Sequence, residues 1–191
     1  STAVFDPYNK HMVGLWKHSV ACSLATVEVA RAAGFQQPEE YSVMGLLHDI
    51  GKVVFAMQIP DARAEVDLLV AEQDVMFKDA EKEVLGFGHD RVNSWLCEHW
   101  NLPLTLKEAM IYHHDPMKAQ FHPEAAAAVH LGDFMARLFE CGSGGDDNLP
   151  PLDPRALRLL NMNPKVVEGI LDEMIGIYSD SSHLTIMYWK N

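Results

Sequence analysis

Apolar residues recur every three to four positions along most of the chain, and Gly, Pro and Asn separate the apolar stretches. This spacing is typical of amphipathic helices joined by short turns. Gly34 marks the end of the first long stretch, and Pro60 interrupts the third. The pattern predicts helices over residues 10–33, 39–50, 53–75, 80–85, 93–100, 106–112 and 124–139.

Two shorter helices are predicted near the carboxyl end, over residues 155–160 and 165–177. Each follows a capping residue and a proline, in the pairs Asp153-Pro154 and Asn163-Pro164, an arrangement that favours a helix start. The weakly alternating tail, residues 183–189, is expected to be extended or disordered.

The helical pattern continues without a convincing linker, so the fold class is predicted to be all-α with one domain over residues 1–191. The core is expected at about residues 10–140 and a helical extension at about residues 150–178. Between them, the glycine-rich run 141–148 is expected to be a flexible loop.

Charge and composition exclude several classes of function. The chain has 15 basic and 27 acidic residues, a formal net charge of −12, and its Lys and Arg are scattered. A nucleic-acid partner is therefore not expected, because phosphate binding needs a positive surface. We find no apolar run as long as a membrane span and no signal-peptide pattern. The three cysteines, Cys22, Cys97 and Cys141, form no C-x-x-C pair and indicate reduced thiols in a cytoplasmic protein.

The adjacent residues His48 and Asp49 are the most informative pair in the chain. They end the apolar segment 39–50, and Gly51 suits a left-handed turn after that helix. Burying a lone carboxylate costs several kcal/mol, whereas a divalent cation shared with an imidazole removes that cost. The alternative is an Asp49 that caps a helix or pairs with Lys52, beside a hydrogen-bonded histidine.

Other histidines and one aspartate occupy similar inward or helix-end positions. For His18 the ordinary alternative is a core histidine bonded to backbone. For the adjacent pair His113-His114 it is one ligand and one surface histidine. Asp133 between apolar neighbours is the hardest to explain without a cation. His130, one turn earlier, could support the ligands or lie on the surface, and His99 is expected on an outer face. The candidates on the remaining helical segments are His18, His89, His113, His114 and Asp133.

The order of these residues resembles the HD superfamily of metal-dependent phosphohydrolases, and specifically the HDOD branch, the HD-related output domain of bacterial signalling proteins. The resemblance covers roughly residues 16–139 closely and implies an HD-type helical bundle. It also implies that an upstream helical region, found in full HDOD proteins, largely precedes this chain. The phrases that carry it are Leu15-Trp-Lys-His-Ser19, Gly45-Leu-Leu-His-Asp-Ile-Gly-Lys52, Tyr112-His-His-Asp-Pro116 and His130-Leu-Gly-Asp133.

The resemblance implies a site with two divalent transition metal ions, bridged by Asp49. Imidazole and carboxylate ligands favour iron, with manganese or zinc as alternatives. Lys52 resembles a lysine that faces the substrate phosphate in catalytic relatives, so Lys52 and Asp49 are the candidate catalytic residues. The ordinary interpretation of Lys52 is a cation at the carboxyl end of a helix. One ion would be held by His18, His48, Asp49 and Asp133, and the other by Asp49, His89, His113 and His114.

Two departures separate the chain from its cyclic-di-GMP phosphodiesterase relatives. The Gly-Tyr-Pro element that follows their paired histidines is absent, and Gly14 stands where some of them place a third-metal Glu. The sequence therefore supports a regulatory output domain with a bound metal and protein partners in signalling. A metal-dependent phosphohydrolase with a nucleotide or phosphate ligand, and a metal-free interaction scaffold, are the alternatives.

Overall fold

The computed structural model describes residues 6–188, and these form helices and connecting turns without a strand. This confirms the all-α prediction. The helices are α1 (Asp6–Ala32), α2 (Tyr41–Leu47), α3 (Ile50–Gln58), α4 (Pro60–Gln73), α5 (Phe77–Leu85), α6 (His89–His99), α7 (Leu104–Tyr112), α8 (Pro123–Leu138), α9 (Pro154–Leu159) and α10 (Pro164–Tyr188), with short 3-10 helices at Pro38–Glu40 and Pro116–Lys118.

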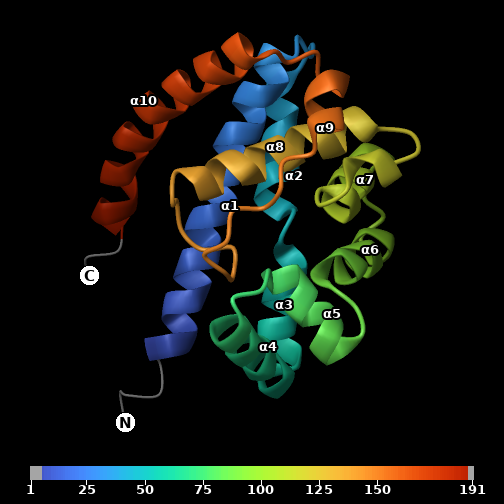
Figure 1. The fold of residues 1–191 in the computed structure, drawn as a ribbon, viewed down its shortest axis with the longest axis vertical. Coiled ribbons are helices and arrows are strands. Elements are labelled where there is room, and N and C mark those ends of the chain that lie inside the picture. Colours follow the sequence, from blue (N-terminus) through green and yellow to red (C-terminus); the bar gives the residue numbers. More distant parts are fainter. Residues whose placement is uncertain (1–5, 189–191) are drawn as a thin grey trace.

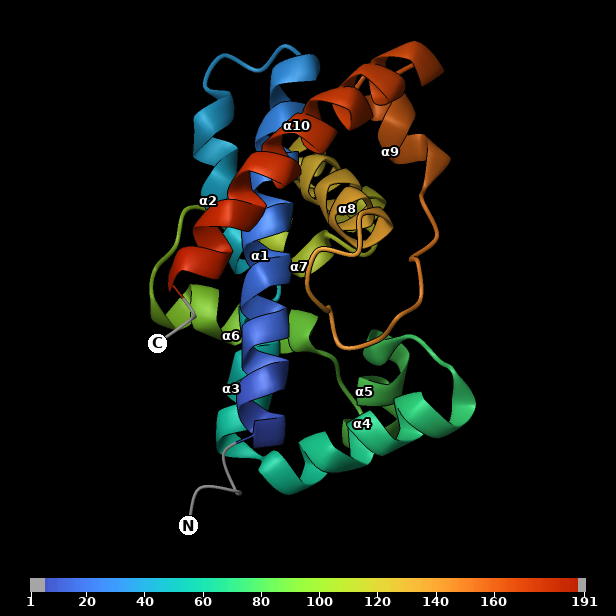
Figure 2. The ribbon, with the colours of Figure 1, turned by 90° about the vertical axis from the view of Figure 1, so that its left-hand side faces the viewer.

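Helix α1 is the axis of the molecule, and α2 and α8 pack most extensively against it. Figure 1 shows α6 and α7 on one side of this centre, α10 on the other, and α3, α4 and α5 grouped at one end. In the turned view, α10 crosses α1, and the connection between α8 and α9 descends towards α5 (Figure 2).

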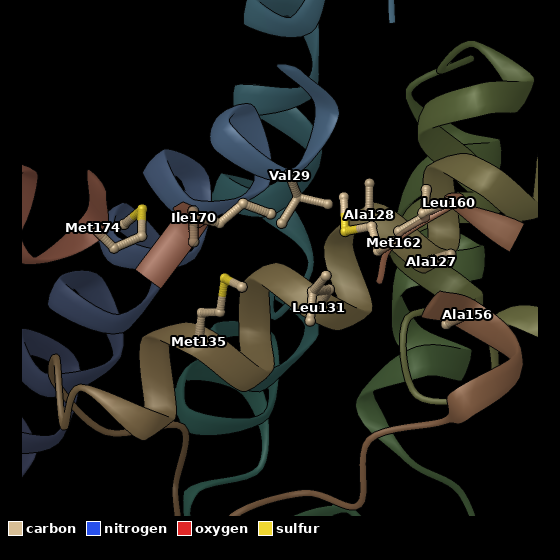
Figure 3. Close-up of a cluster of buried hydrophobic side chains, with 11 residues drawn as sticks. Val29, Ala127, Ala128, Leu131, Met135, Ala156, Leu160, Met162, Ile170 and Met174 are labelled. Carbon is tan, nitrogen blue, oxygen red and sulfur yellow. The ribbon is translucent and has the colours of Figure 1, made fainter. Parts of the chain in front are cut away.

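The largest apolar cluster lies where α1 and α8 meet the carboxyl-terminal helices (Figure 3). Val29 from α1 and Leu131 and Met135 from α8 are fully buried there, together with Ile170 and Met174 from α10. Burial of a side chain of this size contributes about 1.5–3 kcal/mol. The predicted helical extension therefore forms part of the main core.

Small residues allow α1, α2 and α8 to approach closely. A Cβ atom at Gly45 in α2 would lie 2.6 Å from Thr26 Oγ1, and one at Gly132 in α8 would meet the same oxygen still closer. Thr26 turns its hydroxyl inward and donates it to the Cys22 carbonyl at 2.7 Å. This close packing brings the inward faces of three helices to one point.

The structure corrects the predicted central helix. It ends at Leu47, and α3 begins at Ile50, so His48 and Asp49 lie at a junction between two helices. Gly51 belongs to the first turn of α3 and is not left-handed. A Cβ atom there would lie 2.5 Å from the His89 carbonyl oxygen, so glycine is required for the close approach of α3 and α6.

One further expectation needs correction, while two are confirmed. The tail continues α10 as far as Tyr188, because the apolar spacing of the preceding turns extends into it; Trp189 lies outside the described residues. The run 141–148 is a loop, as expected, and its contacts are described below. Gly34 is left-handed, with φ of 78°, as the end of α1 requires.

Within residues 6–188, no individual helix is both long and apolar enough to cross a bilayer. The segments 38–58 and 60–73, which are bent against each other, reach the required length and apolarity only when they are counted together.

A candidate metal centre

Seven side chains from five separate segments converge below the centre of α1. His18 comes from α1, His48 and Asp49 from the α2–α3 junction, and Asp133 from α8. His89 is the first residue of α6, and His113 and His114 follow the last turn of α7. All except the half-buried His114 are buried. The structure brings together every residue that the sequence nominated as a metal ligand.

The first group is built around His18. Its Nε2 atom lies 3.0 Å from Asp133 Oδ1 and 3.3 Å from His48 Nε2. The Oδ2 atom of Asp49 is 3.3 Å from His48 Nε2 and 3.7 Å from His18 Nε2. The ligand atoms of His18, His48 and Asp133 all lie within 4.8 Å of one another.

The second group is built around His89 and the other oxygen of Asp49. His89 Nε2 lies 3.2 Å from Asp49 Oδ1, 3.5 Å from His113 Nε2 and 3.1 Å from His114 Nε2. His113 Nε2 is 3.8 Å from Asp49 Oδ1. Asp49 therefore presents one carboxylate oxygen to each group of histidines, which is the geometry of a bridging ligand.

Hydrogen bonds at the outer ring nitrogens orient three of these imidazoles. The Nδ1 atom of His48 donates to the Gly45 carbonyl at 2.7 Å, and that of His113 donates to the Met110 carbonyl at 2.9 Å. His89 Nδ1 donates to Glu81 Oε2 at 2.6 Å. Because each Nδ1 keeps its proton for an acceptor, Nε2 is the atom left to bind at the centre.

The donor atoms fit a pair of cations. Asp49 Oδ1 is fully buried and accepts no well-formed hydrogen bond from the described residues, although a buried carboxylate oxygen ordinarily accepts one; His89 Nε2 faces it at 3.2 Å. Five imidazole nitrogens and two carboxylates face this space, a donor set that suits iron, manganese or zinc better than magnesium or calcium. A cation between Asp49 and the histidines would satisfy the oxygen and separate the crowded nitrogens.

The pKa values of the paired histidines favour the neutral ligand form. Burial, together with the charge on His48, holds the pKa of His113 well below 6.5; burial and His113 do the same for His114. Burial also lowers the pKa of His18 despite the opposing Asp133 carboxylate.

The pKa values of the Asp49 and Asp133 carboxyl groups are also lowered, which favours their ionised form. Burial alone would raise the pKa of Asp49, but the neighbouring His48 and Lys52 charges hold it well below its usual range. Burial opposes protonation of His48, yet the Asp49 charge raises the pKa of that imidazole well above 6.5. In the metal-free protein, a proton on His48 therefore supplies part of the positive charge that the carboxylate needs.

Two buried polar residues that hold the site were not identified from the sequence. Glu81 Oε2 accepts from both the backbone N–H and Nδ1 of His89. Asn93 accepts from the Gly51 N–H at 2.9 Å and donates to the His48 carbonyl at 2.5 Å and the Met110 carbonyl at 3.0 Å. The only sequence signal was that each is a polar residue on an inward face of an amphipathic helix.

His130 and Arg137, both on α8, also contact the centre. His130 is buried; its Nδ1 donates to the His113 carbonyl at 2.7 Å, and its Nε2 accepts from the Asp153 N–H at 3.0 Å. It therefore supports a candidate ligand and is not a surface residue. Arg137 Nε donates to Asp133 Oδ1 at 3.2 Å and was not identified as a site residue in the sequence, while His99 is exposed as expected.

Lys52 is buried and points into the centre. Its Nζ atom lies 2.6 Å from Asp49 Oδ2 and 2.7 Å from the Gly144 carbonyl oxygen. Since Lys52 lies in the first turn of α3, the interpretation as a cation at a helix carboxyl end is wrong. The helix dipole disfavours a cation at this end, and the Asp49 carboxylate compensates for it.

Comparison with known proteins identifies the family of the chain. A family model described as the HDOD domain matches residues 2–116, more than half of the chain. The chain belongs to the HDOD family. An uncharacterized protein of Treponema pallidum (strain Nichols) is 26% identical to this HDOD chain over 103 residues, which are 53% of the chain and 20% of that protein.

Solved structures of related proteins have the same fold. An HDOD domain protein of unknown function from Geobacter sulfurreducens is 27% identical, with a TM-score of 0.69, and the match covers 91% of this chain and 58% of that one. A candidate signal transduction protein from Marinobacter aquaeolei VT8 has a TM-score of 0.76 at 20% identity, covering 91% and 38%. A candidate phosphohydrolase from Shewanella amazonensis SB2B has a TM-score of 0.65 at 17% identity, covering 86% and 60%. This HDOD chain thus spans less than two thirds of each of these relatives.

Proposed function

We propose that this chain is a regulatory output domain of bacterial signal transduction, in which the buried His/Asp centre holds two divalent transition metal ions. The observation that carries the proposal is the position of Asp49. Its Oδ2 atom lies 3.3 Å from His48 Nε2 and its Oδ1 atom 3.2 Å from His89 Nε2, so each oxygen faces a different group of imidazoles, and Oδ1 accepts no well-formed hydrogen bond from the described residues. Lys52 Nζ lies 2.6 Å from Oδ2 and supplies a cation on that side only; a metal ion among the histidines would supply one for Oδ1.

The first ion would be held by His18, His48, Asp49 and Asp133, and the second by Asp49, His89, His113 and His114. We propose iron, with manganese or zinc as alternatives, because these ions accept mixed imidazole and carboxylate shells. When bound, the ions would supply Lewis acidity and lower the pKa of a bound water. The chain's own residues fix the ligands: Glu81 and Asn93 orient His89, His48 and the α7 end through the bonds described above.

Several features support regulation over catalysis. Lys52, the candidate phosphate-binding cation, already contacts Asp49 and Gly144. No Gly-Tyr-Pro element follows His114, and the chain is strongly acidic, which disfavours a polyanionic substrate. The name of the Marinobacter relative, which refers to signal transduction, supports protein partners in a cytoplasmic signalling pathway.

A metal-dependent phosphohydrolase is the second candidate. The complete set of seven candidate ligands favours it, as does the name of the Shewanella relative. In that function, Lys52 and Arg137 would attract an anionic group, and Asp49 would be the residue shared by both ions. A metal-free interaction scaffold is the third candidate, and it would leave the unpartnered Asp49 oxygen unexplained.

Metal analysis separates these candidates. We expect two ions per chain in protein purified without a histidine tag, and about one in the His89→Ala variant, because each group has its own imidazoles. His99→Ala is the matched control, since His99 is exposed and outside both groups. Only trace amounts of iron, manganese and zinc in the wild type would support the scaffold, and an unchanged metal content in His89→Ala would indicate a single-ion site.

A further inference from the structure

The glycine-rich segment 142–146, which we call the strap, follows α8 and descends towards α5 (Figure 2). It lies beside the candidate metal centre, where Gly144 contacts Lys52 and residues 142–144 line one cavity with His18. Its contacts are spread over four helices. The Ser143 N–H donates to the Gly14 carbonyl of α1 at 3.0 Å, and the Gly144 carbonyl accepts from Lys52 Nζ of α3 at 2.7 Å. Asp146 accepts from the Phe77 N–H of α5 at 2.7 Å and from Arg137 Nη1 of α8 at 2.8 Å.

The first residue of the strap lies directly on the backbone of a candidate ligand. Gly142 is left-handed, with φ of 80°, and a Cβ atom there would overlap the Gly14 carbonyl oxygen and the His18 backbone nitrogen. Only glycine combines this backbone conformation with such an approach. A long side chain at position 14 would also meet the strap, because a Cβ atom there would already lie 3.4 Å from Ser143 Cβ.

The strap separates two cavities. One, of about 230 Å³, is lined by Lys52 and Arg63 among others; the second, of about 590 Å³, is lined by His18 and Arg137. Ser143 and Gly144 line both. The strap is therefore the wall between the space that reaches Lys52 and the space that reaches Arg137. Movement of the strap would join the two spaces, so that one ligand could contact both cations.

We propose that the strap is a movable cover of the metal centre, held closed by Lys52, and that an anionic ligand opens it. The inference rests on the proposed metal binding. The Lys52 ammonium donates to the Asp49 carboxylate and to the neutral Gly144 carbonyl, and the carbonyl is the weaker acceptor of the two. An anion that competes for Lys52 would therefore displace the Gly144 carbonyl first and remove the bond that ties the strap to α3. The strap would then have a closed and an open position, and the change from one to the other could signal that a ligand is bound to the HDOD chain.

The first test measures how fast the centre loses its ions. Wild type and Gly142→Val are loaded with manganese alone, and manganese release to excess EDTA is followed. We expect release to be roughly tenfold faster or more in Gly142→Val, because the side chain prevents the strap from closing. Gly34→Val is the control, since Gly34 has nearly the same φ but a Cβ atom added there would meet nothing within 4 Å. Equal release rates for all three proteins would overturn the proposal.

The second test needs no metal and keeps the proposal falsifiable if Gly142→Val folds poorly or no manganese binds. Hydrogen exchange is measured on the metal-free protein at the Ser143 and Phe77 amides, which donate to Gly14 and Asp146. We expect protection in the wild type, faster exchange at both amides in Asp146→Asn, and faster exchange at Ser143 when inorganic phosphate is added. Exchange at the rate of an unstructured peptide in the wild type, or a phosphate-independent rate, would overturn the cover. Failure to bind iron, manganese and zinc alike would instead contradict the proposed function.

Discussion

Glu81 accepts two hydrogen bonds from His89, one from the backbone N–H at 3.0 Å and one from ring Nδ1 at 2.6 Å. The carboxylate thereby fixes both the start of α6 and the direction of the His89 imidazole. Burial opposes protonation of His89, but the charge on Glu81 raises its pKa. Such a carboxylate makes the imidazole a stronger ligand.

The Glu81→Gln substitution should therefore weaken metal binding while leaving all seven candidate ligands in place. We expect the affinity for manganese to fall about 10- to 100-fold, as measured by titration calorimetry. Glu83→Gln is the matched control, because Glu83 is exposed on the same helix. Equal affinities in both variants would show that Glu81 only supports the fold.

Asp49→Ala should remove both ions, since the residue faces both histidine groups. Each ion that binds only the folded state stabilises it by about 2.7 kcal/mol at a free concentration of one hundred times Kd, or roughly 5–10 °C per ion for a chain of this size. We therefore expect EDTA to lower the melting temperature of the wild type but not that of Asp49→Ala. Asp133→Ala should keep part of its metal, and full metal content in Asp49→Ala would refute the bridging role.

Metal binding should release protons at pH 7. The pKa values of His48 and His89 are raised above 6.5 in the metal-free protein, so these residues carry protons that the ions must displace. At a pH below the raised pKa, the protons on His48 and His89 compete with the metal and favour the metal-free protein. This competition is lost as the pH rises through the raised pKa. We expect manganese affinity to increase from pH 6.5 upwards. Calorimetry at pH 7 in buffers of different ionisation enthalpy measures the released protons, and identical heats would contradict the expectation.

Gly51→Ala should destabilise the protein, because the added Cβ would lie 2.5 Å from the His89 carbonyl oxygen. We expect a loss of about 1–3 kcal/mol in the free energy of unfolding, which is the usual cost of overpacking. Gly169→Ala in α10 is the control; a Cβ atom there meets nothing within 4 Å, and alanine should stabilise the helix by up to about 1 kcal/mol. Urea unfolding measures both, and equal effects would contradict the close approach of α3 and α6.

Metal-loaded protein should show negligible hydrolysis of cyclic di-GMP. The chain lacks the Gly-Tyr-Pro element of its phosphodiesterase relatives, and the Lys52 ammonium is bound to Asp49 and Gly144. At most, slow turnover of an activated phosphodiester is expected, since orientation of the leaving group is missing. Chromatography of the products measures turnover, and robust hydrolysis that disappears in Asp49→Ala would favour the phosphohydrolase over the regulatory domain.

The sequence by itself determined the all-α class, most helix positions and the seven candidate ligands. Helical periodicity and turn residues are local, so they could be read without a structure. His48 and Asp49 stood out because a buried His-Asp pair needs a partner, whichever helices surround it. The pattern could not show that the two residues lie between helices, because the apolar spacing continues across the junction.

Only the tertiary structure decided which groups support those ligands. Glu81 and Asn93 look like ordinary polar residues in their own helices, and their partners His89, Gly51 and Met110 lie 8, 42 and 17 positions away. Gly142 is a further example. The glycine-rich composition around it suggested only a flexible loop, and the structure shows that Gly142 lies against the His18 backbone. Local composition indicates which backbone conformations a segment can adopt, but contacts with distant segments select the conformation that it has in the folded protein.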